Sequence, residues 1–170
     1  MKPLVFNSTP LIYITKTGLS NIFETLDDEK LTSLQVKKEV VDEGKLMGVP
    51  DAMVLEKLFE SNVFRVVKPK NQEFLSRLLK TTGLHVTDAE VLAITREHKG
   101  LAVIDDEVAR KTAKVYGISY VGTPYVLMRA VFEGLITKDK AKQAINDMVS
   151  VSWRCSVETY AMIMKDLEKI

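Results

Sequence analysis

The chain has 170 residues, of which 46% are hydrophobic and 28% are charged, and its 24 Lys and Arg residues nearly balance 23 Asp and Glu residues. This size and composition suit one globular domain and exclude a disulfide-bonded scaffold, because Cys155 is the only cysteine. No apolar run reaches the roughly 18 residues that span a bilayer, and the first residues lack the plan of a signal peptide, so we expect a cytoplasmic protein without a membrane segment.

Short apolar runs alternate along the chain with segments of helical spacing. The runs cover residues 4–6, 31–33, 63–67, 101–104 and 118–121. Between them, apolar residues recur three and four positions apart, as on one face of a helix. Three threonines are predicted to cap helices. Thr9 would cap the helix after the first run, Thr87 the helix before the fourth run, and Thr123 the helix after the fifth run. This alternation predicts an α/β protein whose mostly parallel sheet is covered by helices on both faces.

Two further helices are predicted near the end of the chain, at about residues 138–149 and 156–169, with no strand between them. Their apolar residues recur at helical spacing: Ile145, Met148, Val149, Tyr160, Ile163 and Leu167. We therefore expect residues 137–170 to form a helical extension. It would pack on the domain formed by residues 1–136 or contact a second copy of the chain in a homodimer.

Acidic and amide side chains follow the predicted strands. Asn7 ends the first run, Glu39 lies in the helix after the second, Asp88 opens the helix before the fourth, and Asp105 and Asp106 directly follow the fourth. The carboxyl ends of parallel strands share one edge of a sheet, so these side chains would gather there if the first and fourth strands were neighbours. Several carboxylates around one pocket repel each other, and a hard cation such as Mg²⁺ or Mn²⁺ would neutralise them.

Five segments, in this order and spacing, resemble the PIN-domain family of metal-dependent ribonucleases and toxins of toxin–antitoxin pairs. They are NSTPLIYITKTG, VKKEVV, TDAEVLAI, LAVIDDEVARKTAKVYGI and VGTPYVLMRAVFEGLI, and they span about residues 4–136. The resemblance implies a three-layer α/β/α fold with about five strands in the order 3-2-1-4-5. It also implies an endoribonuclease in which metal-activated water hydrolyses RNA. RNA is then the substrate, and an antitoxin protein is a candidate partner.

Carried over residue by residue, the resemblance implies a site of four acids and one amide. The metal ligands would be Asn7, Glu39, Asp88, Asp105 and Asp106, the four acids would also be catalytic, and the substrate contacts would be Ser8, Thr9, Arg110 and Thr123. The family usually has an acid where this chain has Asn7, although the branch with this GT…GLI ending often has asparagine. An amide keeps one carbonyl ligand but lacks the negative charge.

Ordinary structural roles remain open for the same residues. An aspartate can cap a helix, Glu39 can pair with a lysine, and Asn7 can close the turn between strand and helix. The alternative function is therefore a PIN-fold module that binds RNA or a protein partner with weak or no catalysis. The missing charge at Asn7 is the feature that favours this alternative.

Overall fold

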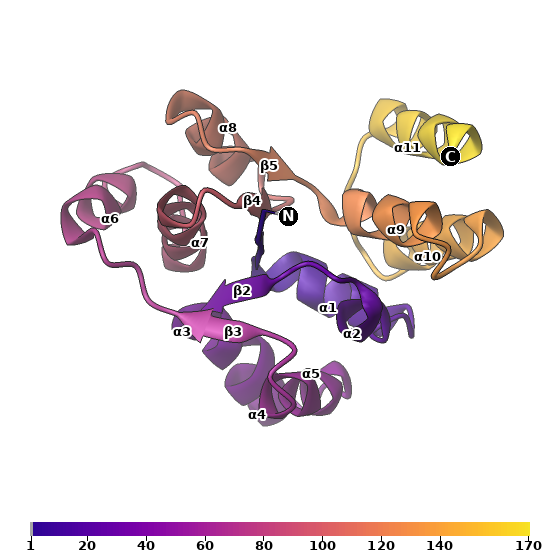
Figure 1. Ribbon diagram of the computed structural model, residues 1–170, viewed down its shortest axis with the longest axis horizontal. Coiled ribbons are helices and arrows are strands. Elements are labelled where there is room, and N and C mark those ends of the chain that lie inside the picture. Colours follow the sequence, from indigo (N-terminus) through magenta and orange to yellow (C-terminus); the bar gives the residue numbers. More distant parts are fainter. Residues whose placement is uncertain (1) are drawn as a thin grey trace.

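The computed structural model describes residues 2–170 and contains a five-stranded parallel sheet in the order β3-β2-β1-β4-β5 (Figure 1). The strands are β1 (Leu4–Phe6), β2 (Lys30–Ser33), β3 (Arg65–Val67), β4 (Leu101–Val103) and β5 (Tyr120–Val121). At the centre of the sheet, Val5 pairs with Leu31 of β2 and with Ala102 of β4. This order confirms the fold that the resemblance implied, and it places the first and fourth strands side by side.

Helices cover both faces of the sheet, which gives three layers. One face carries α6 (Gln72–Leu79), α7 (Val86–Glu97) and α8 (Glu107–Val115) (Figure 1). The other side holds α1 (Ser8–Lys16), α2 (Ile22–Thr25), α3 (Leu34–Lys37), the π-helical η1 (Lys38–Glu43), α4 (Gly44–Leu46), α5 (Asp51–Glu60) and α9 (Thr123–Phe132). Within residues 2–170, no helix combines the length and the apolar character needed to cross a membrane.

The core is densest around the central strand, whose three residues Leu4, Val5 and Phe6 are all buried. A strand with helices on both faces has no solvent-facing side, so a continuous apolar run is stable there. Phe6 also makes edge-to-face contacts with Phe23 and Phe64, at centroid distances of 5.5 and 5.6 Å. These contacts fix the strand whose carboxyl end carries Asn7.

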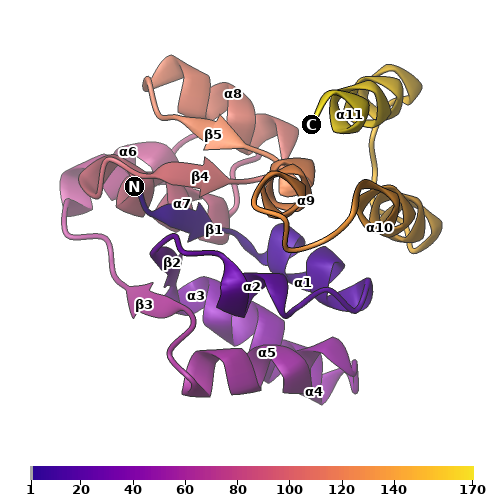
Figure 2. The same ribbon diagram turned by 45° about the vertical axis from the view of Figure 1, so that its right-hand side comes forward.

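The last two helices, α10 (Lys138–Ser150) and α11 (Val157–Lys169), form a hairpin on the body of the protein. α10 contacts α1 and α9, and α11 contacts α10. Ile145 and Met148 are fully buried, whereas Val149, which the spacing placed on the same face, is 42% exposed. The arrows in Figure 2 show that the carboxyl ends of the strands point toward the side where this hairpin lies.

The predicted helix caps were wrong by one to two residues. α1 is capped by Asn7 rather than Thr9, because the Asn7 side chain accepts a hydrogen bond from the first backbone N–H of the helix. α9 begins at Thr123 itself, whose hydroxyl bonds to a distant aspartate instead of capping. α7 begins at Val86, one residue before the predicted cap Thr87, and has no side-chain cap. At α9, therefore, a tertiary contact takes the place of the cap, whereas at α1 the cap is asparagine, which is preferred over threonine at this position.

Candidate active site

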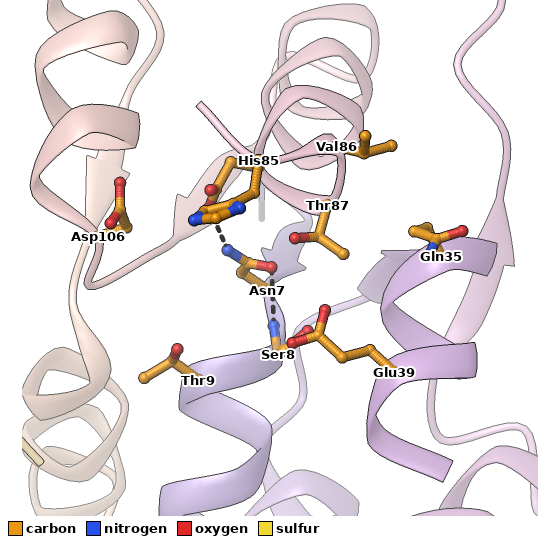
Figure 3. Close-up of a pocket in the computed structure, with 10 residues that line it drawn as sticks. Asn7, Ser8, Thr9, Gln35, Glu39, His85, Val86, Thr87 and Asp106 are labelled. Atoms are coloured by element: carbon orange, nitrogen blue, oxygen red, sulfur yellow. Dashed lines mark hydrogen bonds between the residues drawn. The ribbon is translucent and has the colours of Figure 1, made fainter. Parts of the chain in front are cut away.

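The carboxyl edge of the sheet carries a cavity of about 560 Å³, which we call the first cavity. It is built where the order of the strands reverses between β1 and β4, the usual place for a ligand in an open α/β sheet. Six of the nine predicted site residues line it: Asn7, Ser8, Thr9, Glu39, Asp88 and Asp106. They come from the start of α1, from η1, from the start of α7 and from the loop after β4 (Figure 3).

Asn7 uses both ends of its amide in this cavity. Its Nδ2 donates to Oδ1 of Asp88 at 2.5 Å. Its Oδ1 accepts from the backbone N–H of Ser8 at 2.8 Å (Figure 3). The two side chains are buried, with Asn7 6% and Asp88 2% exposed. A carboxylate at position 7 could not donate to Asp88. The amide therefore stabilises a buried acid that a second acid would repel.

Asp88 is the most perturbed carboxyl group of the site. Its pKa is raised from 3.8 to about 6. Burial is the largest cause and the negative charge of Asp106 the next, whereas hydrogen bonds from the His85 backbone and from Asn7, and the charge of His85, lower the pKa. A shift of this kind, caused by burial and a like charge in a cavity, is typical of functional carboxylates. Near neutral pH, Asp88 is mostly ionised and lacks a full counter-charge.

Ser8 and Glu39 complete the opposite wall of the first cavity. The Ser8 hydroxyl oxygen is buried and has no hydrogen-bond partner among the residues that the structure describes. Such a group is costly unless water or a ligand satisfies it. Glu39 lies in the π-helical segment, and in Figure 3 its carboxylate extends from η1 toward the Ser8 end of the cavity. π-helical turns often mark functional sites.

Asp105 lies outside the first cavity and has several partners of its own. Its Oδ1 accepts from the Thr123 backbone N–H at 2.9 Å, and its Oδ2 accepts from the Thr123 hydroxyl at 2.5 Å and from Nε1 of Trp153 at 2.9 Å. The guanidinium of Arg110 lies 3.5 Å from Oδ1. The absence of a Cβ at Gly122 allows this approach, since a Cβ there would meet both Asp105 and Arg110. Arg110 and Thr123, predicted as substrate contacts, thus hold Asp105 in place.

Asp106, the next residue, points toward the first cavity. One of its oxygens accepts from the backbone N–H of Ala109 at 2.8 Å and so caps α8. The side chain is exposed and lines the first cavity together with Asp88. Of the two adjacent aspartates, therefore, Asp106 faces the first cavity, while Asp105 is held by Thr123, Trp153 and Arg110.

The donors of the first cavity suit a hard cation, although they are spread apart. Within residues 2–170, no three His, Cys, Asp or Glu side chains lie close enough together to hold a metal ion. All the predicted donors are oxygen atoms, and Mg²⁺ commonly keeps several waters while binding one or two carboxylates directly. Asp88 and Asp106 fit such direct ligands, while Glu39 and the unsatisfied Ser8 hydroxyl fit bonds to the waters of the ion.

Some residues of the site carried no usable signal in the sequence. His85 and Gln35 also line the first cavity, but neither lies at a recognisable ligand spacing. Trp153 belongs to the site through a bond to Asp105 that joins positions 48 residues apart. Only the packing of the C-terminal hairpin could reveal that contact.

Comparison with protein families agrees with the fold. A family model described as a PIN domain matches residues 3–169, which include the C-terminal hairpin as well as the sheet. Among curated proteins, none matches the chain.

Proposed function

Since the chain belongs to the PIN-domain family, which has a nuclease-type fold, we propose that it is a divalent-metal-dependent endoribonuclease. The observation that carries the proposal is the pair of Asp88 and Asp106 in one cavity at the strand-order reversal, with the pKa of Asp88 raised to about 6. A buried carboxylate that lacks a full counter-charge is suited to a divalent cation. The substrate is RNA, and the reaction is hydrolysis of a phosphodiester bond.

In the proposed mechanism, the side chains of the first cavity have distinct tasks. Asp88 and Asp106 would hold the cation, and Asn7 orients Asp88 through the hydrogen bond from its Nδ2. A bound Mg²⁺ or Mn²⁺ supplies a Lewis acid and a water of lowered pKa. Glu39 accepts a hydrogen bond from water in the cavity, and the Ser8 hydroxyl donates to a water or a phosphate oxygen. No covalent intermediate on the protein is required.

Cleavage of an end-labelled single-stranded RNA tests this function. We expect cleavage in Mn²⁺ or Mg²⁺, none in EDTA, and a loss of at least about 100-fold in Asp88→Asn, since removing one group that stabilises transition-state charge typically costs this much. Asp166→Asn is the matched control, because Asp166 lies on α11 outside the first cavity and pairs with Lys169. Undiminished cleavage by Asp88→Asn, or cleavage in EDTA, would contradict the proposal.

A second candidate function is an RNA-binding module with little or no hydrolysis. It is favoured by the absence of a compact group of three acidic or histidine ligands in the described chain and by the neutral Asn7. The same experiment separates the two candidates. RNA binding without metal-dependent cleavage in the parent would select the binding module.

Two partners proposed from the sequence accompany this function, an antitoxin protein and a second copy of the chain. The molar mass of the purified protein, measured by light scattering after size exclusion, tests the homodimer. Co-expression with the protein encoded beside it tests the antitoxin, because a stable pair would elute together and would inhibit cleavage.

A further inference from the structure

A second cavity, of about 680 Å³, continues from the first one. The two share Thr9 and Asp106, so they adjoin at the carboxyl end of β4 and the start of α1. The far wall of the second cavity is the link between α10 and α11, residues 151–156, which contributes Trp153 and Arg154. The volume lies within the range of about 300–1,000 Å³ that is usual for small-ligand pockets.

The link is held firmly against the site. Trp153 is 6% exposed, and its indole N–H bonds to Asp105 at the end of β4. At the other end of the link, Ser156 caps α11 by accepting from the backbone N–H of Thr159 at 3.1 Å. Trp153 therefore ties the link to the end of β4, and Arg154 follows it directly in the chain.

The groups around the second cavity match the parts of a nucleotide. Arg154 is exposed and, among residues 2–170, forms no salt bridge, so its guanidinium is available for a phosphate. Tyr13 supplies an aromatic ring, the common partner for an unstacked RNA base. Glu107 supplies carboxylate oxygens that accept from the amino group of a base. Because the acidic residues that line the cavity would repel a phosphate, the cavity suits a whole nucleotide better than a free phosphate ion.

We propose that the second cavity binds the nucleotide next to the scissile phosphate of single-stranded RNA. In this arrangement Arg154 contacts the phosphate of that nucleotide, and its base lies against Tyr13 within reach of Glu107. The inference rests on the proposed function, since it takes the first cavity as the place of cleavage. It makes the C-terminal hairpin part of the substrate site in addition to its packing role.

Binding of a fluorescein-labelled single-stranded RNA hexamer, followed by anisotropy with Ca²⁺ in place of Mg²⁺, tests the inference without cleavage. Arg154→Ala should weaken binding about tenfold and should reduce the slope of log K against log salt by about 0.7, the value for one phosphate contact on a single strand. Lys165→Ala, which removes one positive charge from exposed α11 outside both cavities, should change both quantities little. Tyr13→Leu should weaken binding about tenfold with little change in the salt slope.

The outcomes separate this inference from the proposed function. If the parent binds and cleaves RNA while Arg154→Ala behaves like Lys165→Ala, the second cavity is not a nucleotide site and the proposed function stands. If the parent does not bind RNA at all, both are overturned. Melting temperatures of the variants, which should match the parent for Arg154→Ala, show that a loss of binding is not a loss of folding.

Discussion

The carboxyl edge of the sheet holds two buried or half-buried aspartates whose surroundings differ sharply. Asp105 accepts hydrogen bonds from Thr123 and Trp153 and faces the guanidinium of Arg110. Asp88 faces the like charge of Asp106 and receives its side-chain bond from a neutral amide, Asn7. The first carboxylate is compensated within the protein, and the second is not.

This difference indicates what each carboxylate can do. A carboxylate surrounded by donors and a cation stabilises the fold, and removing it leaves those donors unpaired. A carboxylate that is buried beside another negative charge destabilises the fold unless a ligand compensates it. Asp105 therefore joins β4, α9 and the C-terminal hairpin. The ionised Asp88 instead destabilises the folded state, and a bound cation would remove that cost.

The largest effect on stability is expected from Asp105→Ala. The change leaves the Thr123 N–H, the Thr123 hydroxyl and the Trp153 N–H without their acceptor, and we expect the free energy of unfolding to fall by about 3 kcal/mol in urea titrations. Asp106→Asn is the neighbouring control, because its amide oxygen can still accept from Ala109; it should cost less than about 1 kcal/mol. Equal losses in the two variants would contradict the contrast between these acids.

Asp88→Asn should stabilise the protein in EDTA, with a defined dependence on pH. The folded-state pKa is raised from 3.8 to about 6, so the folded state binds this proton more tightly than the unfolded state. The contribution of the group is therefore most favourable below about pH 4 and is lost as the pH rises through about 6. At pH 8 the variant should gain about 2–3 kcal/mol in free energy of unfolding, since one pKa unit corresponds to about 1.4 kcal/mol.

The difference between parent and Asp88→Asn should shrink as the pH is lowered toward 4, which urea titrations at several pH values will measure. A difference that is constant with pH would show that Asp88 titrates normally. In the parent, Mn²⁺ affinity should rise with pH through about 6, because the cation competes with the proton for the same oxygens.

The effect of Asn7→Asp on stability should change sign when metal is added. Without metal, the new carboxylate replaces the donor that Asp88 receives at 2.5 Å by a like charge, and we expect a loss of about 1–2 kcal/mol. With Mn²⁺, the added anionic oxygen should tighten binding, so the melting temperature should exceed that of the parent. Asn7→Ala, which removes the donor without adding charge, should destabilise in both conditions. A loss for Asn7→Asp that is independent of metal would remove position 7 from the metal site.

The smallest effect is expected from Trp153→Phe, which keeps an aromatic ring and removes only the indole N–H. Loss of the bond to Asp105 at 2.9 Å should lower the free energy of unfolding by about 1 kcal/mol. In an Asp105→Ala background the same substitution should cost much less, because its partner is already absent. Additive losses in this double-mutant cycle would show that the ring, and not the bond, anchors the link.

Much of the fold could be predicted from local patterns. The five apolar runs alternating with helical segments predicted a parallel sheet between helices, because a strand buried on both faces needs continuous apolar residues. The resemblance to the PIN domain supplied the strand order, and with it the expectation that Asn7, Asp105 and Asp106 gather at one edge within reach of Glu39 and Asp88. All of these except Asp105 line the first cavity. The last three runs overestimated strand length: β5, for example, covers only Tyr120–Val121, since pairing with β4 and not apolar character sets its limits.

What the tertiary structure decided is the role open to each polar group. Two consecutive aspartates after β4 look alike in the sequence, and nothing local shows which one faces the first cavity. Thr123 and Trp153, 18 and 48 residues away, bind Asp105, and this leaves Asp106 on the side of Asp88. Likewise, the sequence alone presents Asn7 as a metal ligand without a negative charge. In the structure its amide bonds to the Ser8 backbone and to Asp88. Sequence patterns report burial and local geometry, whereas the charge balance of a carboxylate depends on partners that only folding brings near.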